Sequence, residues 1–560
     1  MLTRRDFVQV AAATALALPS GLARAAAKQT ITQKDLLDFK PVGQVTLLHF
    51  TDIHAQLRPI YYREPSINLG VGAAKGQVPH LTGRAMLDAF GLKAGSEAAY
   101  VLTSEGFTEL ARQYGRVGGL DRMASLVKAI RAERPGKVLL LDSGDTWQGS
   151  YTSLKQQGGD MVEVMKLLGV EAMTAHWEFT YGEARVKELI GQLGFPFLAG
   201  NVKDTDWDED AFPHTTFFEK GGVKIAVIGQ AFPYTPIANP RWMIPKWSFG
   251  IREDEMRTRV EAARKAGAQL VVVASHNGFD VDRKMASRVE GIDVILTGHT
   301  HDAIPNLVKV GKTLLVAAGS HGKFLARLDL NVRNGEVAGH AFKLIPVLSD
   351  AIAPDPEMAA LIQKIRTPHE AEMGKVLGRT ESLLYRRGNF NGTFDDLICS
   401  ALLEERDAEI ALSPGFRWGA TLLPGQDISL EDIYNQTSIT YPAAYRSKMT
   451  GRMLKNILED VADNLFHPDP YYQQGGDMVR VGGMSFTIDP SAKMGSRISD
   501  MRLIKKDAPI DPSAEYAVAG WASVNQNTEG PPVYDVVASY IERKKSIRIP
   551  ESQAVKVKES

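Results

Sequence analysis

Aspartate and histidine residues, which bind divalent cations through oxygen and nitrogen atoms, follow five short apolar runs of this sequence. The runs are dense in valine, isoleucine and leucine, which is typical of strands buried in a sheet. The residues that follow them are Asp52, His54, Asp145, His176, His276, His299 and His301. A site in an open α/β sheet forms beyond the carboxyl ends of its strands, so residues far apart in the sequence can meet there.

These seven residues are too many for one ion and therefore predict a pair of ions. Two divalent cations that share one carboxylate lie about 3.5–4 Å apart, and Asp145 is the natural bridge. Imidazole and carboxylate ligands suit manganese, zinc or iron. Such a pair activates a water molecule and holds an anionic group for in-line attack. The set indicates hydrolysis of a tetrahedral oxyanion ester or a close analogue.

The remaining histidines do not stand at these strand ends, and we interpret them as packing or surface residues. They are His49, His80, His214, His321, His340, His369 and His467. The single cysteine, Cys399, lies in a helical pattern and can form no internal disulfide. We expect it to be a small buried apolar residue.

The segments that must position the seven residues alternate between β-branched runs and helical patterns from about residue 40 to residue 345. This alternation predicts an α/β layered domain. Residues 58–115 are glycine-rich and look like an insertion with loops of its own. Residues 351–375 read as a helix that leaves this domain. Residues 376–550 predict a second, smaller α/β domain, and residues 551–560 a short tail.

Residues 1–27 have the features of a twin-arginine export signal. Arg4 and Arg5 precede a weakly apolar stretch, and the alanines before Lys28 suit a signal peptidase. The first domain then spans residues 28–350, and the mature chain is expected to work in a bacterial periplasm. An ordinary secretory signal is the alternative.

The bulk composition excludes some classes of function. A chain of 560 residues is too long for one hydrophobic core, so at least two domains are expected. The net charge of −1 gives no support to nucleic-acid binding. No internal apolar run reaches the roughly 18 residues that a membrane span needs. The sequence therefore predicts a partner that is neither nucleic acid nor membrane.

Three motifs resemble the calcineurin-type metallophosphoesterases, in particular the two-domain 5′-nucleotidases: Asp52-x-His54, Gly144-Asp145 and Gly298-His299-x-His301. The resemblance covers nearly the whole mature chain. It implies an amino-terminal layered β-sandwich flanked by helices, and a C-terminal substrate-binding α/β domain of 5′-nucleotidase type. It also implies two cation sites that share Asp145. One site would comprise Asp52, His54, Asp145 and His301, and the other Asp145, His176, His276 and His299.

The sequence departs from the nucleotidases where they carry their acid–base pair. They read Gly-Asn-His-Glu-Phe-Asp where this chain reads AHWEFT over residues 175–180. His176 takes the place of a metal-binding asparagine, while Trp177 and Thr180 replace the catalytic histidine and its aspartate. Near the C-terminus, NQNTEGPPVYD replaces a Gly-Gly-Asp-Gly-aromatic stretch that helps to stack a nucleobase. These departures argue against nucleotide hydrolysis.

One branch of the family shares these departures. HFTDIHAQLRPIYYREPSINLGVG and HWEFTYG resemble the thiosulfohydrolases of periplasmic sulfur oxidation. Those enzymes carry two manganese ions and hydrolyse the terminal sulfonate from a cysteine S-thiosulfonate on the swinging arm of the carrier SoxYZ. The resemblance implies the same reaction, partner and Mn²⁺ pair here, with Zn²⁺ as the second choice of metal, in a protein that acts as a monomer.

Four residues are candidates for substrate contacts: Arg417, Trp177, Arg63 and Asn201. Arg417 would bind an anionic group from the second domain. Trp177 would wall an apolar slot for a slim peptide arm, or simply fill space. Arg63 would line the channel or form a surface salt bridge, and Asn201 would orient a ligand or stabilise a turn.

Two other functions stay open at this point. One is a periplasmic 5′-nucleotidase or another phosphomonoesterase. The other is a non-catalytic protein that only binds the carrier, although a pure binder has no need of seven residues of metal-ligand type.

Overall fold

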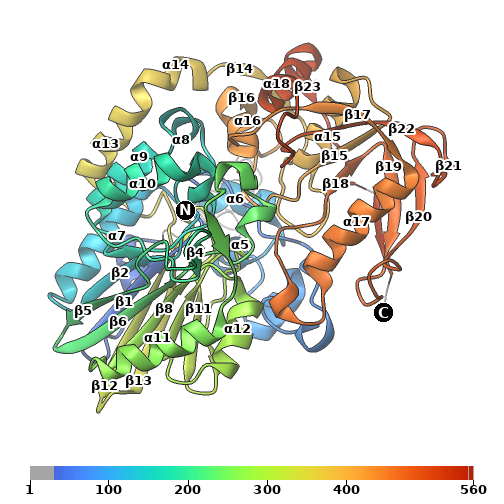
Figure 1. The fold of residues 1–560 in the computed structure, drawn as a ribbon. Coiled ribbons are helices and arrows are strands. Elements are labelled where there is room, and N and C mark those ends of the chain that lie inside the picture. The colour runs from blue at the N-terminus through green and yellow to red at the C-terminus, as the bar shows by residue number, and fades with distance from the viewer. Residues whose placement is uncertain (1–30, 553, 559–560) are drawn as a thin grey trace, which may run out of the picture.

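The first domain is a sandwich of two sheets in the computed structural model, which describes residues 31–552 and 554–558 (Figure 1). The predicted export signal lies outside the described residues. One sheet has the order β13-β12-β1-β2-β3 and the other the order β10-β11-β9-β8-β6-β5. The first comprises β13 (Glu336–Pro346), β12 (Phe324–Arg333), β1 (Val45–Phe50), β2 (Val138–Asp142) and β3 (Ala172–Met173). The second comprises β10 (Val308–Val310), β11 (Thr313–Ala317), β9 (Val294–Thr297), β8 (Leu270–Ser275), β6 (Val223–Gln230) and β5 (Thr215–Lys220).

The pleat of each strand gives the two sheets distinct inner and outer faces. Leu47 of β1 belongs to the core between the sheets, together with Val272 and Leu296 of the opposite sheet. Its neighbour Leu48 belongs to the core between the first sheet and the helices. The helices of that layer are α7 (Leu120–Glu133), α9 (Gly159–Leu168), α10 (Gly182–Leu193) and α13 (Pro356–Arg366). The other sheet is covered by α11 (Glu253–Lys265) and α12 (Phe279–Arg288). The predicted α/β sandwich flanked by helices is confirmed.

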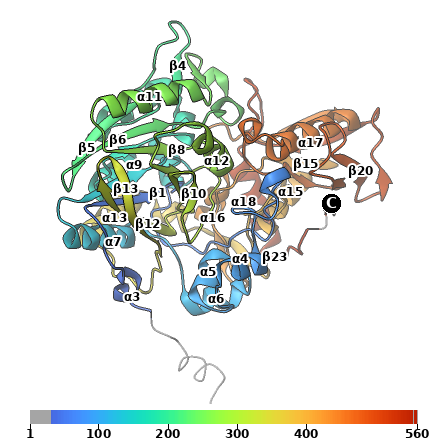
Figure 2. The same cartoon turned by 90° about the horizontal axis from the view of Figure 1, so that it is seen from below.

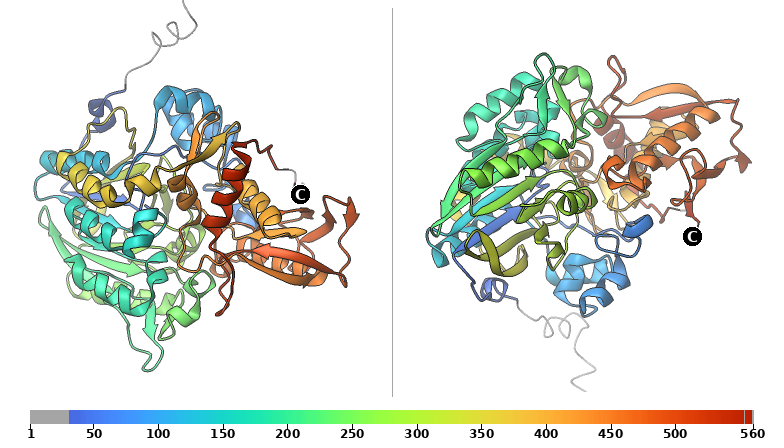
Figure 3. Two further views of the ribbon diagram at one scale, coloured as in Figure 1. Left: turned by 90° about the horizontal axis from the view of Figure 1, so that it is seen from above. Right: turned by 60° about the horizontal axis from the view of Figure 1, so that its bottom comes forward.

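The parallel strands bring their carboxyl ends to one edge of the sandwich. Strand β1 pairs in parallel with β2, and β2 with β3. In the other sheet β8 pairs in parallel with β9. The loops that follow these five strands therefore open at the same edge, which faces the C-terminal domain (Figure 3).

The C-terminal domain is built around a sheet of the order β17-β22-β15-β18. Its strands are β17 (Tyr445–Thr450), β22 (Glu515–Gly520), β15 (Ile410–Ser413) and β18 (Arg480–Gly482), and its helices are α15 (Thr393–Glu405), α16 (Leu430–Thr437), α17 (Gly451–Phe466) and α18 (Val533–Lys544). Cys399 is buried in α15, as expected. Two small sheets complete the domain: β16 (Asp427–Ser429), β14 (Val376–Thr380) and β23 (Ser546–Ile547), and β21 (Ala508–Pro509), β20 (Ile498–Leu503), β19 (Met484–Ile488) and β24 (Val555–Val557).

Two segments have more structure than the sequence predicted. The supposed tail contributes β24, which pairs in parallel with β19, so the interpretation of residues 551–560 as a mere tail was wrong. The insertion contains α4 (Gly83–Phe90), α5 (Glu97–Leu102) and α6 (Phe107–Tyr114), which lie between the two domains in Figure 2. Its backbone also bonds to the C-terminal domain, because Leu69 N donates to Asn389 Oδ1 at 2.6 Å. Within the described residues no helix is both long and apolar enough to cross a membrane.

Candidate metal centre

The seven predicted ligands meet in the loops that follow β1, β2, β3, β8 and β9. Five of them have a left-handed backbone: Asp52 (φ 53°), His54 (48°), Asp145 (58°), His299 (73°) and His301 (58°). This conformation costs a side-chain-bearing residue about 1–3 kcal/mol and persists only where the surrounding structure enforces it, as at functional sites. The side chains of these residues leave the strand direction and lie close to one another.

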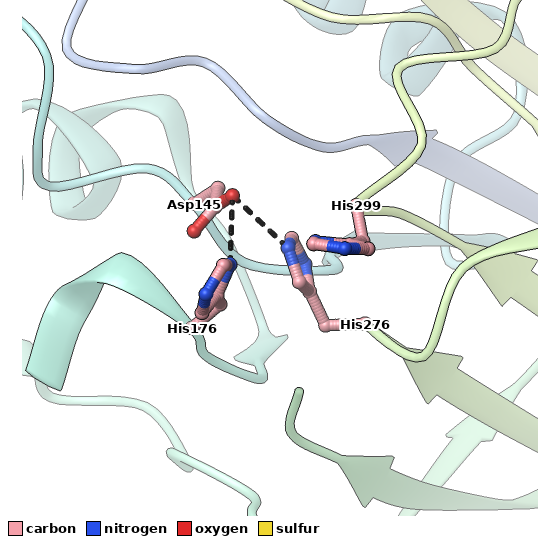
Figure 4. A group of neighbouring side chains, drawn as sticks. All are labelled: Asp145, His176, His276 and His299. Carbon is pink, nitrogen blue, oxygen red and sulfur yellow. Dashed lines mark hydrogen bonds and ion pairs between the residues drawn. The ribbon is translucent and has the colours of Figure 1, made fainter. Parts of the chain in front are cut away.

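The first group comprises Asp145, His176, His276 and His299 (Figure 4). Asp145 Oδ2 lies 3.3 Å from His176 Nδ1 and 3.0 Å from His276 Nε2. His276 Nδ1 donates to Ser143 O at 2.5 Å, so Nε2 is the ring nitrogen left to face the Asp145 carboxylate. All four residues are buried and offer one ligand atom each within 4.8 Å of one another.

The second group comprises Asp52, His54, Asp145 and His301. His54 Nδ1 donates to Gln148 O at 3.2 Å, so its Nε2 carries a lone pair. That Nε2 lies 3.1 Å from His301 Nε2 and 3.7 Å from Asp145 Oδ2. Asp52 Oδ1 lies 3.2 Å from His301 Nε2. Asp145 thus stands in both groups.

The chemistry of these groups fits a pair of divalent cations. The buried Nε2 atom of His299 has no hydrogen-bond partner in the described structure, and Nε2 of His276 faces the Asp145 carboxylate. Burial, together with neighbouring imidazoles, lowers the pKa values of His299 and His301 well below the ordinary range. Both imidazoles are therefore neutral, the form that binds a metal. The His176 and His276 imidazoles overcome the effect of burial on Asp145 and hold its pKa well below the usual value.

At two positions the backbone lies so close to the metal centre that only glycine fits. A Cβ on Gly298 would lie 2.4 Å from Thr51 Oγ1 and 2.9 Å from His276 Nδ1. Gly475 of the C-terminal domain has φ +75°, and a Cβ there would lie 2.0 Å from His299 Nε2. The backbone of the second domain therefore packs directly on a candidate ligand.

Glu178 is a functional residue that sequence reasoning missed. Its buried carboxylate accepts backbone N–H groups from both ligand loops. His176 N donates at 2.8 Å, Thr146 N at 2.7 Å, and Asp145 N and Trp147 N at 3.3 Å. Glu178 thereby fixes the relative positions of Asp145 and His176. The signal was available, since the family motif quoted above retains this glutamate.

We expect Glu178→Gln to weaken cation binding and activity by about 10–100-fold, the usual effect of losing a group that orients ligands. Four backbone N–H groups bond to the two carboxylate oxygens of Glu178, whereas the carboxamide of glutamine has only one acceptor oxygen. Titration with Mn²⁺ followed by calorimetry measures the loss. Glu188→Gln, an exposed change on α10, is the matched control. Equal affinity of the two variants would contradict the role of Glu178.

A cavity of about 450 Å³ opens beside the centre and is lined from both domains. Trp177 forms part of its wall, with its ring edge-on to Trp418 (4.9 Å between centroids) and Phe416 (5.2 Å). Phe232 stacks on His299 at 4.1 Å. Arg417 also lines the cavity, and its Nη1 donates to His299 O at 3.1 Å. An anion at the centre would meet a cationic side chain and an aromatic wall.

The structure does not support two of the predicted substrate contacts. Arg63 does not line this cavity, and its guanidinium lies over the Tyr385 ring at 4.1 Å. Asn201 is buried, and its amide is used by backbone groups of Ala231 and Gly250. It therefore stabilises the loop that carries Phe232. For Asn201 the alternative role of stabilising a turn therefore fits the structure. The two substrate-contact roles lack support because proximity in sequence to a ligand strand does not fix the direction of a side chain.

His321 is a second residue that sequence reasoning missed. It was interpreted as a packing or surface residue, yet its ring centroid lies 5.4 Å from that of His54 and 5.6 Å from that of His301. It belongs to neither ligand group. Its loop follows β11, which is not one of the five strands whose ends were predicted to carry the ligands.

Comparison with known proteins gives consistent matches. Residues 376–536 match the family model described as the C-terminal domain of 5′-nucleotidase. The chain is 25% identical to the 5′-nucleotidase of Bos taurus over 451 residues, which is 72% of this chain and 75% of that protein. It is also 25% identical to UshA of Yersinia enterocolitica over 482 residues, 76% of this chain and 84% of that protein.

Solved structures show the same architecture over nearly the whole chain. The sulfate thiohydrolase SoxB of Thermus thermophilus, in complex with glycerol, superposes with a TM-score of 0.89 at 36% identity and covers 93% of this chain and 98% of its own. A 5′-nucleotidase precursor from Thermus thermophilus superposes with a TM-score of 0.72 at 20% identity, covering 92% of this chain and all of its own. The second likeness is one of fold alone.

Proposed function

This chain belongs to the family of the sulfate thiohydrolase SoxB and the 5′-nucleotidases, and from that membership we propose that it hydrolyses the terminal sulfonate of a cysteine S-thiosulfonate. The proposed substrate is carried on the peptide arm of the carrier protein SoxYZ, and the product is sulfate. The proposed cofactor is a pair of Mn²⁺ ions held by the two groups that share Asp145. The twin-arginine signal predicted for residues 1–27 would place this reaction in the periplasm.

Trp177 is the observation that carries this proposal. It stands directly after the candidate ligand His176, lines the cavity and is only 4% exposed. An indole cannot transfer a proton at neutral pH. Thr180, the other departure from the nucleotidase motif, bonds across the domain boundary through its Oγ1, 2.8 Å from Thr440 Oγ1. Neither position therefore offers an acid for an alkoxide leaving group.

The chemistry of a thiosulfonate makes such an acid unnecessary. Attack of water on the terminal sulfur forms a sulfur–oxygen bond and breaks the sulfur–sulfur bond. The carrier cysteine keeps the leaving group as a persulfide anion. Even an ordinary cysteine thiol has a pKa of about 8.5, and a persulfide is more acidic, so this group leaves unprotonated. A phosphate monoester expels an alkoxide, for which a positioned acid contributes about 10²–10⁴-fold.

The other catalytic roles in the proposed reaction fall to the cations and to residues of this chain. A bound pair of cations supplies Lewis acidity and lowers the pKa of water to near neutrality. The backbone N–H of Trp177 donates to Asp145 Oδ1 at 2.7 Å and orients this carboxylate, which belongs to both ligand groups. Arg417 places a positive charge where the sulfonate oxygens enter. The aromatic wall of Trp177, Phe416 and Trp418 excludes water from the slot around the arm.

Restoring the acid–base pair tests the leaving-group argument. We expect Trp177→His combined with Thr180→Asp to give no more than about a twofold gain in sulfate release, since the persulfide needs no proton. Ion chromatography of sulfate released from a thiosulfonated carrier peptide measures the rate. A gain of tenfold or more would show that proton donation limits the native enzyme and would overturn the argument.

A nucleotidase function is the second candidate, because the curated relatives above are 5′-nucleotidases. Phosphate release from AMP under the same conditions decides between the two. The proposal requires sulfate release from the thiosulfonated peptide and little phosphate from AMP. The reverse result would favour the nucleotidase.

A further inference from the structure

His321, like His49, is a buried imidazole that neither ligand group uses. It is 1% exposed and has a left-handed backbone, with φ 57°. Its ring packs between His54 and His301 on one side and Tyr62 of the insertion on the other, with a centroid distance of 4.3 Å to Tyr62. The residue therefore stands where the sandwich, the insertion and the metal centre meet.

Both ring nitrogens of His321 are hydrogen-bonded, and the bonds define its tautomer. The backbone N–H of Gly419, in the C-terminal domain, donates to Nε2 at 3.2 Å. Nε2 therefore carries the lone pair, and the ring proton sits on Nδ1, 2.8 Å from Ser320 Oγ. Ser320 Oγ in turn donates to the Tyr62 hydroxyl at 3.3 Å. The imidazole is a fixed link between the two domains.

The segment that this link holds carries two side chains of the cavity. Arg417 donates to His299 O, and the Trp418 ring lies 5.7 Å from the His54 ring. Among the backbone N–H groups of residues 415–419, only that of Gly419 has an acceptor in the described structure. Among the main-chain N–H groups of this stretch, the hydrogen bond from Gly419 to His321 is therefore the one that holds it in place.

We propose that His321 is a positioning residue, which holds residues 415–419 of the C-terminal domain against the metal centre so that Arg417 and Trp418 form the substrate slot. It acts through Gly419 and contacts neither substrate nor cation. The inference rests on the proposed function for its effect on turnover, but the link itself is a property of the fold.

The test compares two replacements of different chemistry. His321→Phe keeps a flat ring of similar size but has no acceptor for Gly419 N–H. His321→Gln offers a carbonyl oxygen near the position of Nε2. His340→Phe, an exposed change on β13, is the control. Should the Phe variant fail to fold, His321→Asn replaces it, because the shorter amide cannot reach Gly419.

Hydrogen exchange, followed by mass spectrometry on a peptide covering residues 415–422, reads the link directly. We expect the Gly419 amide to exchange at least about tenfold faster in His321→Phe and at the native rate in His321→Gln and the control. Native protection in the Phe or Asn variant would overturn the proposal. This readout stands even if the protein does not hydrolyse thiosulfonates, so the two proposals can fail separately.

Turnover on the thiosulfonated peptide gives the second readout. We expect His321→Phe to raise KM at least about fivefold, keep kcat within about twofold and retain both cations, as is typical when substrate binding alone is lost. His321→Gln should restore native KM. Loss of cations from the Phe variant, or an unchanged KM, would contradict a positioning role for the slot.

Discussion

Asp145→Asn is expected to abolish cation pairing and to lower kcat/KM by at least about a thousandfold. The Asp145 carboxylate is the only residue common to both groups, and its Oδ2 lies 3.0–3.7 Å from His276, His176 and His54. A neutral carboxamide cannot bridge two cations, and several kcal/mol of transition-state stabilisation depend on them. Each 1.4 kcal/mol corresponds to about tenfold in rate.

Metal analysis of the Asp145→Asn protein, purified without chelator, measures the first part of this expectation. We expect fewer than one tightly bound ion per chain, against two in the native protein. Asp350→Asn, a change of an exposed carboxylate in the same domain, should retain both ions and full activity. Two retained ions with near-native turnover in Asp145→Asn would show that the bridge is elsewhere.

The second large effect is substrate discrimination. We expect kcat/KM for a cysteine S-thiosulfonate to exceed that for AMP by about 10²–10⁴-fold, because that is the contribution of the general acid that Trp177 replaces. The aromatic contacts of Trp177 with Phe416 and Trp418 also fill the space beside His176. A nucleotide therefore meets an indole where a proton donor would be needed.

Competition between the two substrates at equal concentration measures this ratio, with sulfate and phosphate quantified in one sample. Methyl phosphate is a useful control for size, because it has the same poor leaving group as AMP without the nucleoside. Slow turnover of both phosphates would confirm that the leaving group decides the preference. Rapid turnover of methyl phosphate would show that the centre supplies an acid from another residue.

The ligand set could be predicted from the sequence because its chemistry is local. Each candidate ligand follows a strand within a few residues, as His276 follows β8 directly, and parallel strands end at one edge. Residue type and strand order thus determine where the two groups assemble. The layered α/β fold followed from the same alternation of buried runs and helical patterns.

The surroundings of the ligands could not be predicted in this way. His321 lies beside His54 because β11 runs parallel to β9 and therefore ends at the same edge of the sandwich, a pairing that no residue near His321 signals. The family motif retains Glu178, but its role in positioning the ligands becomes apparent only from the four backbone N–H groups that converge on it. Arg63 and Asn201 fail as substrate contacts for the converse reason, since their partners Tyr385 and Ala231 are distant in sequence.

The strand β24 illustrates the limit for weak elements. Residues 555–557 are too few to show a periodic pattern, and their pairing with β19 supplies the stability that propensity does not. Short edge strands of this kind depend on a partner strand already in place.

Sulfate release from a thiosulfonated carrier peptide, measured before chelation, after chelation and after resupply of Mn²⁺, tests the central claim most directly. We expect release by the native protein, loss of release on chelation, and recovery only once about two ions per chain have been restored. Release that survives complete removal of the metal, or no release from the fully loaded protein, would contradict the two-cation mechanism.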